Sequence, residues 1–233
     1  MPRFILPLFL MALLLAAPAI AQSSFSVMPR IGYGTFSMQG LKTVQEGFKY
    51  QNDLGLEVVE EFPAYYQFGL QFRYNISERY AGGIVLETGS TGGRVAYADY
   101  SGSIRADQLV SYKSAGTFSE YLIREGKLNW YACIEVTAVR SALTLETTSQ
   151  IKQHHGHDKD ELVAIGVGIK PYVSLKYPVK RFVPEISMGY LFYYGKPFHL
   201  REDERMILSA NNKEIGPDWG GLRVTAGIGV LLF

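Results

Sequence analysis

The stretch LRVTAGIGVLLF, residues 222–233, decides how the rest of the chain is interpreted. Successive side chains of a strand point to opposite faces. One face of this stretch is apolar throughout: Leu222, Val224, Ala226, Ile228, Val230 and Leu232. The other face carries Arg223, Thr225 and two glycines, and the chain ends in Phe233. Strands of membrane β-barrels have one lipid-facing and one lumen-facing side, so this stretch predicts the closing strand of such a barrel.

Seven further stretches alternate in the same way, which predicts an all-β chain: an eight-stranded antiparallel transmembrane β-barrel with up-and-down meander topology. The predicted strands are about 25–38, 62–74, one that begins near Tyr80, 108–124, 128–138, 163–175, 182–194 and 222–232. In the second of these, Phe62 and every second residue after it are placed on the lipid side. The alternation continues past Leu86 and past Ala138, so the third and fifth strands are expected to project beyond the bilayer.

The predicted connections alternate in length along the chain. Tight turns are expected near 75–78, 124–127 and 178–181, and longer links at about 39–61, 101–107, 151–160 and 197–217. Outer-membrane barrels have short turns on the periplasmic side and long loops outside. An even number of strands then puts both chain ends on the periplasmic side.

The N-terminal sequence and the amino-acid composition indicate the cellular location of the chain and its possible partners. Residues 1–21 have the pattern of a signal peptide, with Arg3, an apolar stretch and Ala19-Ile20-Ala21 as the cleavage site, which leaves residues 22–233 as one barrel domain. Loss of Arg3 reduces the 23 Lys and Arg residues to 22, equal to the 22 Asp and Glu residues. Because neither sign dominates, this balance argues against a nucleic-acid partner and against a protein that binds anionic surfaces. Cys133 is the single cysteine, so no intrachain disulfide can form.

Aromatic residues gather at both ends of the predicted strands. Amphipathic rings favour the headgroup level of a membrane, so two aromatic belts are expected. The belt residues are Tyr74, Tyr80, Trp130, Tyr177 and Phe182 beside the short turns, and Tyr65, Tyr66, Tyr194 and Trp219 beside the long links.

Charged residues recur at positions that face the predicted lumen. They are Arg30, Arg73, Glu87, Glu120, Glu135, Lys170, Glu185 and Arg223. Eight strands enclose a space that side chains can fill, and buried charges must pair or be hydrated. Four acids and four bases favour a closed lumen held by salt bridges. A narrow hydrated path for small solutes is the alternative.

The chain resembles the small outer-membrane barrels typified by OmpX, OmpA and OmpW. Three stretches are similar to the Bacteroidetes-type outer-membrane β-barrel domain: Ile31-Gly32-Tyr33-Gly34, residues 97–102 (YADYSG) and residues 227–233 (GIGVLLF). The resemblance covers nearly all of the chain after residue 21. It implies a barrel in a Gram-negative outer membrane, with Phe233 as the C-terminal assembly signal, and it implies no particular activity.

Other chemistry is possible in the predicted loops. His154, His155 and His157 form a candidate metal site, although a solvated loop explains them as well. His199 with Ser209 and Asp203 would be the partners of an outer-membrane enzyme. A soluble lipocalin-like barrel is a further alternative, but its apolar side chains would have to face inward. The aromatic belts and the terminal Phe233 argue against this alternative.

The sequence therefore predicts a non-enzymatic outer-membrane barrel that needs no cofactor or metal. Its role is structural, or surface binding through the long loops and projecting strands. A porin-like channel or carrier is the alternative. The expected partners are the lipid bilayer with lipopolysaccharide, the outer-membrane assembly machinery and a surface protein, and the chain is expected to be a monomer.

Overall fold

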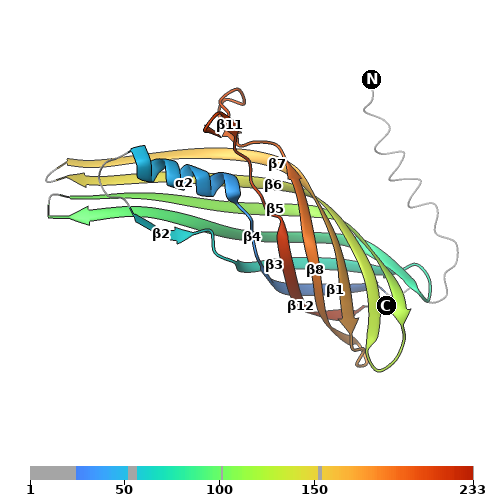
Figure 1. The fold of residues 1–233 in the computed structure, drawn as a ribbon. Coiled ribbons are helices and arrows are strands. Elements are labelled where there is room, and N and C mark those ends of the chain that lie inside the picture. Colours follow the sequence, from blue (N-terminus) through green and yellow to red (C-terminus); the bar gives the residue numbers. More distant parts are fainter. Residues whose placement is uncertain (1–24, 52–56, 101, 152–153, 233) are drawn as a thin grey trace, which may run out of the picture.

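A computed structural model describes residues 25–51, 57–100, 102–151 and 154–232. The predicted signal peptide and Phe233 lie outside these ranges. Eight antiparallel strands form a closed ring, in which each strand pairs with the next along the chain and the last pairs with the first (Figure 1). The ring strands are β1 (Phe25–Gly34), β3 (Tyr65–Asn75), β4 (Tyr80–Asp99), β5 (Gly102–Arg124), β6 (Asn129–Ile151), β7 (His154–Lys176), β8 (Phe182–Gly195) and β12 (Gly221–Leu231).

The outer surface of the ring is apolar, which confirms the predicted eight-stranded transmembrane barrel with meander topology. The alternation of each strand turns large hydrophobic side chains outward and leaves them exposed. Examples from five different strands are Ile31, Phe68, Ile134, Val173 and Ile186. Such a surface is stable only against lipid, because it would otherwise expose a continuous apolar patch to water.

Four strands continue well beyond the ring. β4 has 20 residues and β5, β6 and β7 have 23 each, whereas about 9–11 residues cross a bilayer. Residues 90–99, 102–111, 142–151 and 154–163 of these strands pair with one another past the ends of β3 and β8, and we call them the projecting sheet. In Figure 1 this sheet bends away from the ring. The projection of β4 and β6 agrees with the sequence analysis.

The predicted loops at 101–107 and 151–160 are wrong, because strands β5 and β7 already run through most of these residues. Residues 154–160 are polar on both faces, and residues 102–107 contain one large apolar side chain, Ile104, so neither segment has the hydrophobic alternation that marks a strand. They pair instead through cross-strand partners such as Arg94 with Asp107 and Glu146 with Lys159. The irregularity expected in the fourth strand is present, as a register shift between Leu122 and Arg124.

The first and last long connections fold back over one end of the ring. The first contains helix α2 (Gln39–Gln51) and strand β2 (Glu57–Glu61), which pairs with the edge of β4. The last contains the short strands β9 (His199–Leu200), β10 (Ser209–Ala210) and β11 (Lys213–Glu214). Within the described ranges, no helix is long and apolar enough to cross a membrane.

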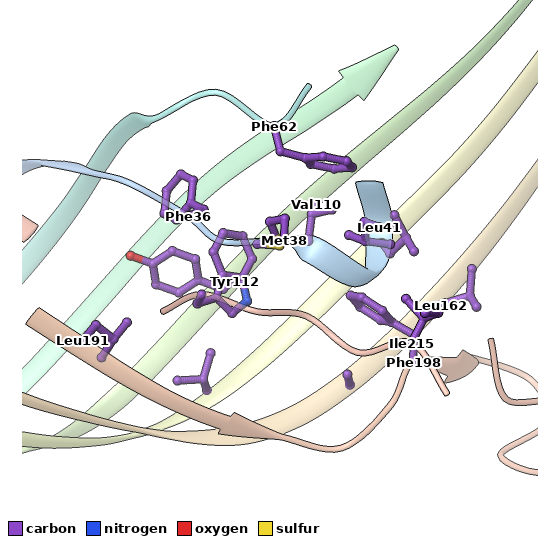
Figure 2. Packing of buried hydrophobic residues seen from close by; sticks show 14 residues of the cluster. Phe36, Met38, Leu41, Phe62, Val110, Tyr112, Leu162, Leu191, Phe198 and Ile215 are labelled. Carbon is purple, nitrogen blue, oxygen red and sulfur yellow. The ribbon is translucent and has the colours of Figure 1, made fainter. Parts of the chain in front are cut away.

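These connections bury an apolar cluster, which we call the mouth core, against the inner face of β5, β6, β7 and β8 (Figure 2). Its residues are Phe36, Met38, Leu41, Phe62, Val110, Tyr112, Val139, Leu143, Leu162, Ala164, Leu191, Phe198, Ile215 and Trp219. The first predicted strand therefore ends early, at Gly34, and the second begins late, at Tyr65. Phe62 was predicted to face lipid, but it precedes β3 with a positive φ of 41° and is buried in the mouth core.

Candidate functional site

The ring interior at the end with the short turns holds a buried group of charges around Glu120, which we call the Glu120 cluster. The Glu120 carboxylate accepts hydrogen bonds from Arg73 Nε at 2.8 Å and from Lys176 Nζ at 2.7 Å. Lys176 also forms an ion pair with Glu185 at 3.1 Å. The Glu120 side chain is 0% exposed, so its charge depends on these two cations rather than on water.

A second group, the Glu135 cluster, lies next to it along the barrel axis. Arg30 Nη2 donates to Glu87 at 2.8 Å and to Glu135 at 3.1 Å, and Lys170 Nζ lies 3.0 Å from Glu135. Each cluster contains two acids and two bases, so both are formally neutral. Balanced pairs of this kind can be buried because each charge has an opposite partner within hydrogen-bond distance.

Gln71 joins the two clusters. Its side-chain oxygen accepts from Arg30 Nη1 at 3.2 Å, and its amide nitrogen donates to Glu120 at 3.4 Å. Gln71 is fully buried, so the bridge lies inside the ring rather than at its surface. The two clusters therefore form one polar network that crosses the lumen.

The structure brings seven of the eight predicted lumen charges into these clusters: Arg30, Arg73, Glu87, Glu120, Glu135, Lys170 and Glu185. Lys176 is a lumen charge that was not predicted, because the predicted strand ended one residue before it. The signal was present, since Lys176 follows Lys170 and Ser174 on the same inward alternation.

Arg223 differs from the other predicted lumen charges. It is buried, but its guanidinium donates to the backbone oxygens of Thr35, Leu222 and Trp219, the last at 2.5 Å. Its guanidinium carbon lies 4.8 Å from the centroid of the Phe36 ring. Arg223 therefore ties the two connections to the ring under the mouth core, instead of joining an ion pair as predicted.

The mouth core closes the lumen on the side of the projecting sheet. Trp219 packs against Tyr112 and Phe36, with ring centroids 4.6 Å and 5.2 Å away, and its Nε1 donates to Ser141 Oγ at 2.8 Å. The cavity between Trp219 and the Glu135 cluster measures about 10 Å³, which is about the size that holds one water.

Trp219 is therefore a correction to the predicted aromatic belts. It was expected at the membrane surface, but its side chain is 1% exposed inside the barrel. In the tertiary fold the segment before β12 turns inward over the lumen. The position of Trp219 next to a strand end in the sequence does not indicate this turn. The other belt residues are exposed, as predicted for side chains at a membrane surface: Tyr65, Tyr66, Tyr74, Tyr80, Trp130, Tyr177, Phe182 and Tyr194.

The lumen opens into a vestibule at the short-turn end of the ring. This vestibule holds about 190 Å³ and reaches Arg73, Lys176 and Glu185. Beyond it lie the two clusters and then the mouth core. The interior is thus filled by ion pairs at one end and by apolar packing at the other.

The projecting sheet carries a different kind of charge pattern on its outer face. Asp107 accepts from Arg94 Nε at 2.5 Å and from Arg105 Nε at 2.6 Å. Partial burial opposes the ionisation of Asp107, but hydrogen bonds from Arg105 and Arg94 outweigh it and hold its pKa below the ordinary value. This face is therefore a charged, solvated surface, unlike the apolar ring below it.

The histidines predicted to lie in a loop belong to β7 instead. The backbones of His154 and His155 pair with Ile151 and Gln150, while their side chains lie outside the described part of the chain. His157 is exposed, with its Nδ1 3.8 Å from a Glu146 carboxylate oxygen. A single described imidazole beside one carboxylate does not make a metal site.

Comparisons with known proteins add a likeness of fold. No protein-family model and no curated protein matches the chain. Among solved structures, Ail of Yersinia pestis, in complex with the heparin analogue sucrose octasulfate, is 14% identical, with a TM-score of 0.35 over 90% of this chain and 97% of that one. The outer membrane protease OmpT of Escherichia coli is 8% identical, with a TM-score of 0.39 over 90% and 96%. The N-terminal β-barrel domain of Pseudomonas aeruginosa OprF is 12% identical, with a TM-score of 0.26 over 91% and 100%.

Proposed function

We propose that this chain is a non-enzymatic protein of a bacterial outer membrane, a closed barrel that presents the projecting sheet outside the cell as a binding surface. The observation that supports the proposal is the filled lumen. Two neutral ion-pair clusters fill it on the side of the short turns, and the mouth core fills it on the side of the projecting sheet. A barrel filled in this way offers no path for solutes. The apolar exterior and the signal-peptide pattern of residues 1–21 support the location, with the short turns in the periplasm.

A closed lumen makes a direct prediction about conductance. The purified chain, inserted into planar lipid bilayers, should show no steady single-channel current, because both the clusters and the mouth core block the axis. Insertion is verified separately by protease protection of the ring strands in the same lipid. Steady current from inserted protein would contradict a closed lumen and would favour a narrow channel. Solutes would then enter this channel through the vestibule at Arg73 and Lys176.

The binding surface we propose is the free edge of β7 in the projecting sheet. β8 pairs with β7 only from Gly166 onward, and β9 pairs with it at Leu162 and Val163. Residues 156–160 of β7 therefore continue past these partners, with β6 on their other side. An extended segment of a partner can add to such an edge through backbone hydrogen bonds.

Charge on this edge indicates the chemistry of the partner. Asp158 and Asp160 are exposed and lie on the same face as Leu162, toward the inner side of the sheet. An extended segment with basic residues at alternate positions would place them opposite these carboxylates. The edge therefore fits a basic, extended peptide better than an acidic one.

Peptide binding tests this edge. The probe is a fluorescent eight-residue peptide of alternating Lys and Val, compared with one of alternating Glu and Val. The Asp158→Asn/Asp160→Asn double variant should bind the basic peptide about two- to thirty-fold more weakly, because two opposite-charge cross-strand pairs are lost.

The matched control for this test is Glu78→Gln/Glu125→Gln, which removes the same charge from exposed turns at the opposite end of the barrel. It should leave the affinity unchanged. Equal binding of the two peptides, or equal loss in both double variants, would show non-selective charge attraction and would contradict a binding role for this edge.

A further inference from the structure

The outer face of the barrel has a broad apolar depression where the ring continues into the projecting sheet. It is an open hollow of about 1310 Å³ that extends across the outer surface from β3 to β8. Its floor is made by Ala115 and Ala138, which are directly opposed on β5 and β6. Leu86 on one side and Val167 and Tyr194 on the other belong to the same cross-strand row and form the walls. Two small residues between larger ones thus make a hollow in the lipid-facing surface.

Three cations line the rim of this depression on the side of the projecting sheet. Lys113 and Arg140 are exposed and directly opposed on β5 and β6, and Lys196 follows β8, with its backbone nitrogen bonded to Ile165 at 2.9 Å. Among the described residues, no carboxylate forms an ion pair with any of the three. Like charges directly opposed across a strand pair repel each other and destabilise the pair. A bound anion would offset the repulsion between Lys113 and Arg140.

The acids on the same outer face are either distant from the rim or already paired. Glu161 on β7 is four residues from Ile165, the partner of Arg140, and it forms ion pairs with Lys159 and Arg201. Asp107 is six residues from Lys113 along β5, and Glu146 is six residues from Arg140 along β6. At about 3.3 Å per residue these distances are roughly 20 Å. That is about twice the screening length at ordinary salt, so Lys113 and Arg140 keep an unbalanced positive potential.

The rim lies at the boundary between the apolar ring and the polar projecting sheet. The row next to the floor, toward the short turns, contains exposed Ile84, Val136 and Phe192. Beyond the rim the outer face changes to the charges around Asp107. Cations at such a boundary lie at headgroup height in a bilayer.

We propose that this depression binds a bisphosphorylated lipid of the outer leaflet, of the lipid A type. Its acyl chains would lie over Ala115 and Ala138, one phosphate between Lys113 and Arg140, and the second near Lys196. Strands are about 4.8 Å apart, so Lys196 on the β8 side lies roughly 10 Å from Arg140 and suits a separate phosphate. The inference rests on the proposed location of the chain in an outer membrane.

Lipid binding to the full chain in detergent micelles tests the site, with diphosphoryl lipid A as the probe and monophosphoryl lipid A and phosphatidylcholine as comparisons. Lys113→Ala/Arg140→Ala should bind diphosphoryl lipid A about 25-fold more weakly, since each cation near an anionic headgroup contributes about five-fold. Lys196→Ala should abolish most of the preference for diphosphoryl over monophosphoryl lipid A, also about five-fold.

Two further variants separate the parts of the site. Arg124→Ala/Lys127→Ala removes two exposed cations near the opposite end of the barrel and should leave the affinity unchanged. Ala115→Phe/Ala138→Phe fills the depression without touching the cations, and its outward side chains are compatible with the fold. It should weaken lipid A binding while leaving the cations accessible to inorganic phosphate.

Equal affinity for diphosphoryl lipid A and phosphatidylcholine would overturn the proposal, as would full displacement of the lipid by millimolar inorganic phosphate. Each protein is first tested for insertion into phosphatidylcholine vesicles by protease protection of the ring. A wild-type chain that fails to insert contradicts the proposed membrane location. A chain that inserts but does not distinguish the lipids contradicts the lipid site alone.

Discussion

Replacing Glu120 by alanine should lower the free energy of unfolding by about 3–5 kcal/mol, because it leaves buried cations without their partner. The Glu120 carboxylate binds both Arg73 and Lys176 and has no exposed surface. Lys176 keeps Glu185 at 3.1 Å, but Arg73 loses its carboxylate. The measurement is urea unfolding of the protein in lipid vesicles, followed by tryptophan fluorescence.

Two controls show whether charge pairing is responsible. Glu204→Ala removes an exposed acid from a turn and should change stability by no more than about 0.5 kcal/mol. Glu120→Ala combined with Arg73→Met removes the acid together with the cation that it would leave unpaired, and it should recover part of the loss because the Lys176–Glu185 pair remains. If Glu120→Ala unfolds like the wild type, the Glu120 cluster does not stabilise the closed lumen.

Replacing Trp219 by alanine should have an effect of similar size, about 3–5 kcal/mol, through a different mechanism. The side chain fills the centre of the mouth core between Phe36 and Tyr112, and its loss leaves a cavity and a Ser141 hydroxyl without this donor. The connections at 35–51 and 196–219 should loosen first, since they contact the ring largely through this core. Limited proteolysis should then cut them faster.

The chain contains its own matched control for this change, because Trp130 is the second tryptophan. Its side chain is 43% exposed on the outside of the ring. Trp130→Ala should lower stability by about 1 kcal/mol or less and leave the proteolysis of the connections unchanged. Equal losses in the two variants would contradict a stabilising core at the mouth.

The alternation of the ring strands was readable from the sequence because the face of a strand residue depends only on local parity. Parity placed Glu87, Glu120 and Glu135 inside and Trp130 and Val136 outside, and the structure agrees. The same parity would have found Lys176 had the strand been extended by one residue. Local pattern failed where too few apolar residues mark a strand, as in residues 102–107 of β5, in which Ile104 is the one large apolar side chain.

Phe62 and Trp219 show a second limit of local pattern. Phe62 begins a predicted strand and Trp219 lies just before one, and both have side chains expected at a lipid surface, yet both are buried in the mouth core. The backbone leaves the alternation at Phe62 with a positive φ, and the segment before β12 turns over the lumen. No local periodicity distinguishes an aromatic residue that faces lipid from one that covers the mouth of a barrel.

The barrel class, most of the ring strands and the inward-pointing charges follow from the amino-acid sequence, because they depend on a period of two along one strand. The pairing of the charges, the extent of the projecting sheet and the closure of the mouth depend on how the strands and connections pack together. Arg30 and Glu135 are 105 residues apart in the chain, and they pair because the register of several intervening strands brings them to the same height in the lumen. Register is a property of neighbouring strands together, so no single strand can specify it.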